Sequence, residues 1–288
     1  MGIAFGLGAA LSWGVADYFA AVASRRVGPL RVVVGFHVVA TVLLGGLVLA
    51  TNSLASLSWS QVPFFVGLGA VGWLSYLAFY AALAIGPISV VSPIVSGYAA
   101  VTVLLAIAIS GERLDAGAAI AVIVTIVGVS ASSTDVSRIR GIAHERRAAL
   151  GLLLALVAMV LLGGFVFGVS YRHRALGWLG PIFLARGFAT LFLLGHTARQ
   201  GIRWPRCSPK LLGVVVLLSI VDTCGYACFN LGAEHAATSV VATASAPYAL
   251  VPILAGVVLL RERPTQLQRL GVPAKIGREV YSHLHRTG

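Results

Sequence analysis

Long apolar stretches follow one another along the whole chain, separated by short segments that contain Arg, Pro, Gly or Asn-Ser. Nine such runs lie near residues 2–24, 30–50, 62–84, 88–109, 115–132, 149–171, 177–197, 210–232 and 236–260. A helical span needs roughly 20 apolar residues, and in hydrocarbon the backbone must satisfy its own hydrogen bonds. The pattern therefore predicts an all-α, polytopic membrane helix bundle with nine spans.

A polar segment at residues 134–148 divides the chain into two similar halves. With an offset of 150, residues 76–113 align with 226–263 without a gap, and 11 of the 38 positions are identical. Apolar bias alone does not produce the aligned aromatic and Glu-Arg pairs, which are Tyr76/Tyr226, Phe79/Phe229, Tyr98/Tyr248 and Glu112-Arg113/Glu262-Arg263. This self-similarity indicates an internal repeat.

The repeat predicts the domain organisation. We expect a first five-helix repeat at 1–133, a second repeat at 149–263 with four helices, and a basic, non-spanning tail at 264–288. Since five is an odd number, the second copy enters the membrane from the opposite side, and such inverted repeats hold a substrate site near the midplane. The tenth helix is missing from the pattern. A truncation or frame change near residue 272 and a genuine nine-helix variant both explain this.

Composition supports a membrane protein without enzymatic chemistry. Hydrophobic residues make up 58% of the chain and charged residues 10%, which excludes a single water-soluble core. The net charge of +12 comes from clusters between apolar runs, so membrane lipids rather than nucleic acid are the expected partner. ATP-binding, zinc-protease and serine-hydrolase motifs are absent from the sequence. We therefore expect no catalytic residue, metal or cofactor.

Three segments together resemble the EamA-type branch of the drug/metabolite transporter superfamily. They are WGVADYF at 13–19 with SRR at 24–26, ALAIGPISVVSPIVSGYAAVTVLLAIAISGERL at 82–114, and the weaker copy LGAEHAATSVVATASAPYALVPILAGVVLLRERP at 231–264. The resemblance implies two five-helix repeats over residues 2–272. It also implies a secondary transporter that moves a small metabolite or drug-like solute, with export favoured, across the cell membrane by alternating access. The alternatives are a non-transporting remnant or interaction subunit and, less favoured, a membrane-embedded enzyme.

Membrane orientation has two readings. Most Lys and Arg residues fall in the odd-numbered loops and the tail, so the positive-inside rule places the N-terminus outside. The family implies a cytoplasmic N-terminus. Both orientations stay open at this point.

Ionisable groups at membrane depth are costly, and they are therefore functional candidates. Asp17 lies one helical turn after Trp13 on the same face, so a carboxylate and an aromatic ring would line one wall. Either Asp17 or Asp222 could couple transport to protons. Arg186 could form an ion pair with Asp222 or bind a substrate carboxylate. His37 could relay protons or form a hydrogen bond at a helix contact.

Two polar stripes at helical spacing complete the candidate pathway. One consists of Asp222, Tyr226 and Asn230, and its counterpart consists of Gly72, Tyr76 and Tyr80, with Trp73 beside it. They predict the walls of a central cavity, to which Tyr98 and Tyr248 are added by the repeat, or else polar contacts that only hold helices together. The hinge candidates are Pro93, Gly97, Pro247 and Pro252. Glu112 and Glu262 are expected to be headgroup-level anchors or gating salt bridges.

Overall fold

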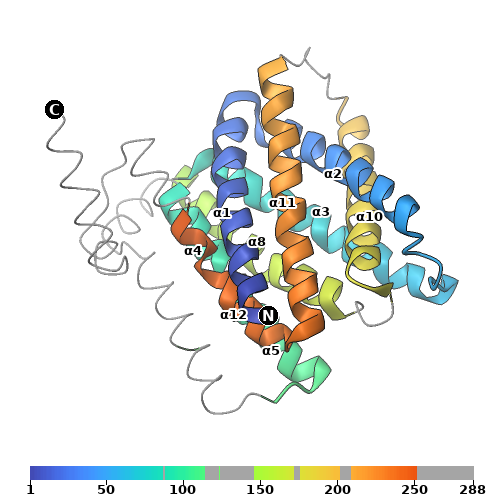
Figure 1. The fold of residues 1–288 in the computed structure, drawn as a ribbon. Coiled ribbons are helices and arrows are strands. Elements are labelled where there is room, and N and C mark those ends of the chain that lie inside the picture. Colours follow the sequence, from blue (N-terminus) through green and yellow to red (C-terminus); the bar gives the residue numbers. More distant parts are fainter. Residues whose placement is uncertain (87, 114–122, 124–145, 172–175, 202–208, 252–288) are drawn as a thin grey trace, which may run out of the picture.

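The computed structural model describes residues 1–86, 88–113, 123, 146–171, 176–201 and 209–251. Every regular element in these ranges is a helix (Figure 1). The α-helices are α1 (Gly2–Val27), α2 (Pro29–Thr51), α3 (Val62–Ile85), α4 (Ile88–Ser96), α5 (Tyr98–Ser110), α8 (Arg146–Tyr171), α10 (Leu179–Arg199), α11 (Pro209–His235) and α12 (Thr238–Ser245). Two short 3₁₀ helices are η1 (Trp59–Gln61) and η2 (Ala246–Ala249).

Seven spans of the described part are long and apolar enough to cross a membrane: Gly2–Val27, Pro29–Thr51, Trp59–Ile85, Val90–Ser110, Ala149–Tyr171, Leu179–Arg199 and Pro209–His235. They coincide with seven of the nine runs expected from the sequence. The run at 115–132, except for residue 123, and the tail at 264–288 lie outside the described residues. The run at 236–260 is described only as far as residue 251.

The polarity of the bundle is that of a protein surrounded by lipid. Large apolar side chains are exposed on its outside, including Leu11, Val42, Leu104, Leu153 and Leu191. The acidic and basic side chains of Asp17, Asp222 and Arg186 are instead buried between helices. Hydrocarbon accepts the first group and penalises the second, so the chain is a multi-pass membrane protein.

The apolar run at 88–109 is not the single helix that its hydropathy predicts. The helix is interrupted at Gly97, which separates α4 from α5, and Pro93 lies inside α4. A side chain at Gly97 would stand 2.6 Å from the Met159 sulfur of α8, so glycine permits this close approach. In the second repeat, α12 gives way at Ser245 to η2, which contains Pro247. Both interruptions therefore lie at matching positions of the repeats.

Helices of one inverted repeat pack against helices of the other. The first helix of each repeat packs along the third helix of the other, α1 on α11 and α8 on α3, and Figure 1 shows α1 and α11 side by side. Gly14 of α1 lies against the Tyr248 carbonyl, and Gly163 of α8 lies against the Tyr98 carbonyl. Because Tyr98 and Tyr248 are repeat equivalents, Gly163 is the structural counterpart of Gly14. This register between α1 and α8 is not visible in the sequence alignment, which begins at residue 76.

Candidate substrate pathway

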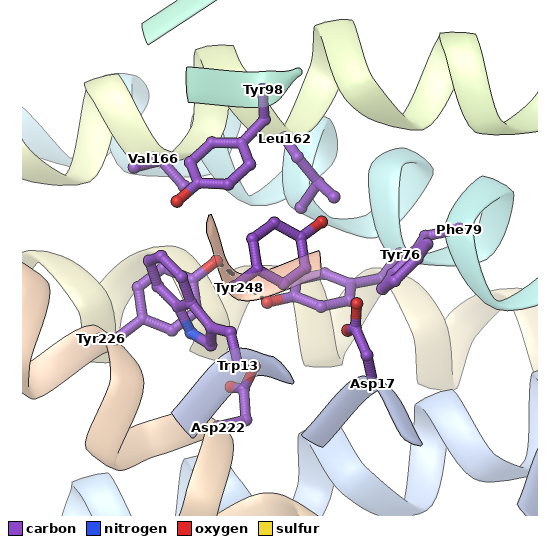
Figure 2. Close-up of a pocket in the computed structure, with 10 residues that line it drawn as sticks. All are labelled: Trp13, Asp17, Tyr76, Phe79, Tyr98, Leu162, Val166, Asp222, Tyr226 and Tyr248. Atoms are coloured by element: carbon purple, nitrogen blue, oxygen red, sulfur yellow. Dashed lines mark hydrogen bonds between the residues drawn. The ribbon is translucent and has the colours of Figure 1, made fainter. Parts of the chain in front are cut away.

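A small cavity lies where the two repeats meet. Its volume is about 40 Å³, enough for ordered water. Side chains from both repeats converge on it (Figure 2): Trp13, Asp17, Tyr76, Phe79, Tyr98, Leu162, Val166, Asp222, Tyr226 and Tyr248. The cavity therefore brings together seven of the pathway residues expected from the sequence.

Equivalent tyrosines of the two repeats touch each other at this cavity. The hydroxyls of Tyr76 and Tyr226, which are 150 residues apart, lie 3.0 Å from each other and share a hydrogen bond. The ring centroids of Tyr98 and Tyr248 are 5.8 Å apart. A residue can contact its own symmetry equivalent only near the axis that relates the two copies. The pseudo-two-fold axis therefore passes through the cavity.

The chemistry of the cavity does not follow its symmetry. Since Gly14 corresponds to Gly163, Trp13 corresponds to Leu162, and Asp17 to Val166. All four side chains line the cavity. The wall formed by α1 therefore carries an indole and a carboxyl group, whereas the equivalent wall formed by α8 is aliphatic.

Two of the cavity tyrosines form hydrogen bonds between the repeats. The Tyr98 hydroxyl shares a 2.6 Å hydrogen bond with Ser245 of α12. The Tyr248 hydroxyl donates to the Ser92 carbonyl of α4 at 3.4 Å. Each tyrosine thus reaches the short broken helix of the opposite repeat, so movement of either helix would disturb the aromatic lining.

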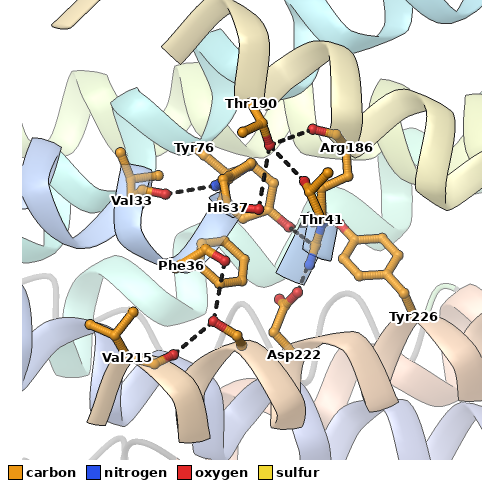
Figure 3. A network of polar contacts seen from close by, with 11 residues as sticks. Val33, Phe36, His37, Thr41, Tyr76, Arg186, Thr190, Val215, Asp222 and Tyr226 are labelled. Atoms are coloured by element: carbon orange, nitrogen blue, oxygen red, sulfur yellow. Dashed lines mark hydrogen bonds and ion pairs between the residues drawn. The ribbon is translucent and has the colours of Figure 1, made fainter. Parts of the chain in front are cut away.

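Arg186 and Asp222 form the ion pair at one wall of the cavity (Figure 3). Arg186 Nη2 donates to Asp222 Oδ2 at 2.5 Å and to the Tyr76 hydroxyl at 3.2 Å. The guanidinium carbon also lies 4.9 Å from the ring centres of both Phe36 and Tyr226. Stacking on aromatic faces and a carboxylate partner are the two ways a buried guanidinium is stabilised. The Arg186 side chain is itself not part of the cavity lining.

Asp17 has no such counter-charge. It is 7% exposed, and its Oδ2 atom has no hydrogen-bond partner in the described structure. The Ser92 hydroxyl oxygen likewise has no hydrogen-bond partner there, and no cationic side chain pairs with Asp17 among the described residues. The indole nitrogen of Trp13, one turn away, also lacks a partner there. Figure 2 shows the Asp17 carboxyl group pointing toward the aromatic rings.

Comparison with known proteins identifies the family of the chain. A model of the EamA-like transporter family matches residues 1–134 and 149–275, which is most of the chain. The protein belongs to the EamA-like transporter family. A solved crystal structure aligns with a TM-score of 0.69 at 17% identity, over 94% of this chain and 92% of that one, and it supports the fold alone. No curated protein matches the chain.

The family assignment makes this chain a membrane transporter of the drug/metabolite type. The described part agrees with that architecture in its two repeats, its apolar exterior and its central cavity between the repeats. Members of the family are transporters rather than enzymes.

Several expected pathway residues of this EamA-like transporter lie away from the cavity. His37 is fully buried between helices, where its Nδ1 atom bonds the Val33 carbonyl at 2.9 Å and its ring packs 4.6 Å from that of Tyr76. Tyr80 stacks on Phe36 at 6.0 Å. Both belong to the packing behind the cavity wall, and neither lines it.

Trp73 and Asn230 turn toward other helices. Trp73 packs on Phe192 and His196 of α10, at centroid distances of 5.8 and 5.7 Å. Asn230 is buried and donates from its Nδ2 atom to the Trp178 carbonyl at 2.9 Å. The stripes predicted from helical spacing therefore reach the cavity only in part, because Asn230 is bonded to the residue that precedes α10 and Trp73 packs on α10 itself.

The hinge candidates lie beside the cavity tyrosines. Gly97 immediately precedes Tyr98, and Pro247 immediately precedes Tyr248, at the two helix interruptions. Pro93 lies one turn earlier in α4, and Pro252 lies outside the described residues.

Glu112 forms no salt bridge among the described residues, whereas its expected role as a headgroup-level anchor stays a prediction. Its two oxygens accept hydrogen bonds from the backbone N–H groups of Thr238, at 3.0 Å, and Ser239, at 3.1 Å. It thus caps the first turn of α12 from the opposite repeat, a favourable place for a carboxylate. Glu262 lies outside the described residues.

The structure adds three cavity residues that the sequence reading missed: Phe79, Leu162 and Val166. Phe79 could have been found from its match with Phe229 in the repeat. Leu162 and Val166 are ordinary aliphatic residues in an apolar helix, so only the packing of α8 against the opposite repeat identifies them.

Proposed function

We propose that this EamA-like transporter is a secondary carrier that moves a small organic solute across the cell membrane by alternating access, in the export direction. The observation that carries the proposal is the cavity on the pseudo-two-fold axis, lined by ionisable and aromatic groups from both repeats. Two inverted copies around one site can exchange conformations, so that the site opens first to one side of the membrane and then to the other.

In the proposed cycle, the described conformation is one in which the cavity is too small for the solute. A cavity of about 40 Å³ is far below the roughly 300 Å³ of pockets that hold drug-like molecules. The rings that fill the space, among them Tyr98 and Tyr248, follow directly after Gly97 and Pro247. Bending at these interruptions would move the tyrosines apart and enlarge the site.

Proton coupling through Asp17 is part of the proposal. Asp222 has Arg186 as its counter-ion, whereas Asp17 has none among the described residues. Burying an ionised carboxylate without a partner is costly. Exchange of a proton at Asp17 would remove that cost during the step in which the cavity is closed to both sides.

Alternating access can be tested without knowing the substrate. A Val166→Cys variant, in a chain whose native cysteines are replaced by serine, places a thiol in the cavity wall of α8. A membrane-impermeant methanethiosulfonate is applied to sealed vesicles of right-side-out and inside-out orientation. We expect modification from both sides, because each conformation exposes the site to one of them.

A matched control uses the same helix. Leu153 is 56% exposed on the outer surface of α8, where lipid would cover it, so Leu153→Cys should react from neither side. Modification of the Val166→Cys variant from one side only, or from neither, would contradict alternating access and favour a non-transporting subunit.

A further inference from the structure

One of the two carboxyl groups at the cavity, that of Asp17, has no positively charged partner among the described residues. Of the two acidic residues in its wall, Asp222 is neutralised by Arg186. Asp17 is buried, reaches the cavity and has no cationic partner in the described part of the chain. Ion pairing therefore remains available to one positively charged group in the solute.

Aromatic rings surround the Asp17 side of the cavity. The Trp13 ring lies edge-on to Tyr226 at 5.0 Å and to Tyr98 at 5.8 Å, and the Tyr98 ring adjoins that of Tyr248. Aromatic faces attract ammonium groups, and a cluster of them recognises alkylated ammonium ions, whose charge is only weakly hydrated. Asp17 lines the same cavity as these rings, and its carboxyl group points toward the aromatic cluster (Figure 2).

The opposite wall favours an apolar body. Leu162 and Val166 occupy the positions that Trp13 and Asp17 occupy on the other side of the pseudo-two-fold axis. A site with a charged, aromatic wall and an aliphatic wall orients an amphipathic molecule, with its polar head at α1 and its apolar part at α8. A solute with a charged group at each end would not match these two different walls.

A substrate carboxylate finds no corresponding partner. Arg186 Nη2 already donates to Asp222 and Tyr76, and Arg186 lies outside the cavity lining. Lysine, arginine and histidine are absent from the side chains that line the cavity in the described structure. The carboxylate of an anion or of a zwitterion would therefore find no cationic partner in the cavity, and it would lie close to the negative charges of Asp17 and Asp222.

We propose, building on the transport function above, that the solute is a monovalent amphipathic organic cation, an amine or quaternary ammonium compound. Its nitrogen lies between Asp17 and the rings of Trp13, Tyr98 and Tyr248. Its apolar portion lies against Leu162 and Val166.

Equilibrium binding tests the charge preference in the unmodified protein. Benzyltrimethylammonium, its uncharged carbon isostere neopentylbenzene, and zwitterionic phenylalanine are titrated into nanodisc-embedded protein by calorimetry, with empty nanodiscs subtracted. We expect the cation to bind at least ~10-fold more tightly than either of the others. Equal or tighter binding of the isostere or of phenylalanine would overturn the proposal, and this comparison needs no variant to fold.

Substitution of Asp17 tests the site. Asp17→Asn should weaken benzyltrimethylammonium binding by roughly 30-fold or more, since a buried charge pair loses one member, and should leave neopentylbenzene binding unchanged. Glu234→Gln makes the same chemical change at an exposed position of α11 and should bind the cation like the unmodified protein. Unchanged affinity in Asp17→Asn would refute the assignment.

The asymmetry of the walls allows a sharper test. The double variant Asp17→Val/Val166→Asp moves the carboxyl group to the equivalent position on the other wall. It should not recover the cation binding that Asp17→Val alone loses, because the carboxyl group then lies beside the aliphatic Leu162 while the Trp13 ring stays on the α1 wall. Full recovery of binding by the double variant would contradict the orientation proposed.

The outcomes separate this inference from the transport function. Transport of non-cationic solutes by proteoliposomes, with no preference for benzyltrimethylammonium, would remove the cation assignment and keep the carrier. Selective cation binding without alternating modification of the Val166→Cys variant would keep the site and remove the carrier.

Discussion

Arg186 is the largest fully buried side chain among the described residues. Its charge is stabilised by the groups that surround it. Asp222 supplies the opposite charge, Tyr76 accepts a second hydrogen bond, and Phe36 offers a ring face. Breaking such a pair from one side leaves an uncompensated charge, which costs more than the pair contributes. Arg186 and Asp222 therefore behave as a unit.

Arg186→Met should destabilise the protein by about 3–5 kcal/mol, because it strands the Asp222 carboxylate in the bundle. Thermal unfolding in detergent measures the effect. The double variant Arg186→Met/Asp222→Asn should regain most of the loss, and Arg199→Met, at the exposed end of α10, should unfold like the unmodified protein. A double variant no more stable than Arg186→Met would show that the ion pair is not the cause.

Asp17 predicts a dependence of conformation on pH. Ionisation of this buried group favours states in which water reaches the cavity, so the Val166→Cys variant should be modified faster as the pH rises. The same variant carrying Asp17→Asn supplies the reference for the reagent's own pH response, and it should lack the additional increase. The other groups that act electrostatically on Asp17, or that it acts on, are Asp222, Tyr80, Tyr98 and Tyr248. An identical pH response in both proteins would exclude Asp17 as the proton site.

At the scale of the element, glycine determines how closely helices approach the broken segments. A side-chain carbon at Gly163 would stand 2.8 Å from the Tyr98 carbonyl and 2.5 Å from Val101. Gly14 meets Tyr248 and Val251 in the same manner. The first helix of each repeat is therefore in backbone contact with the interruption beside a cavity tyrosine, where any bending would be transmitted.

Gly163→Ala should cost about 1–3 kcal/mol, since a methyl group is forced into a filled contact. Its neighbour provides the control, because a side chain at Gly164 meets nothing within 4 Å. Gly164→Ala should leave stability unchanged or raise it by up to about 1 kcal/mol through the helix propensity of alanine. Equal melting temperatures for the two variants would contradict the close packing of α8 on α5.

At the scale of the whole molecule, the two repeats are joined more extensively to each other than a pair of separate domains would be. The first helix of each packs on the third helix of the other, and Glu112 of the first repeat caps α12 of the second. Neither half can therefore complete its packing alone. A rocking motion must preserve these crossed contacts and change the angles between the helices.

The inverted arrangement predicts that equivalent loops lie on opposite sides of the membrane. Ala55, after α2, and Gln200, after α10, are exposed positions of matching connections. Cysteines at these two sites, in a chain without native cysteines, should react with an impermeant maleimide from opposite faces of sealed vesicles. Reaction from the same face would exclude inverted repeats, and the face that modifies Ala55→Cys would also fix the orientation of the N-terminus.

The sequence by itself determined the class of the protein, its repeat and the inventory of chemically active groups. Membrane spans can be read locally, because each helix must satisfy its own backbone hydrogen bonds in hydrocarbon and must present apolar side chains to it. The equivalence of Tyr76 with Tyr226 and of Tyr98 with Tyr248 was likewise readable from one alignment, whereas the structure shows that the members of each pair contact each other at the axis.

Only the tertiary structure decided which side of each helix faces the cavity. Helices that are apolar all round carry no periodic signal for an inward face. Trp73 and Asn230 thus turned out to face neighbouring helices, while Leu162 and Val166 turned out to complete the cavity. The isolation of Asp17 and the neutralisation of Asp222 also depend on where α10 places Arg186, and that position follows from packing between segments far apart in the chain.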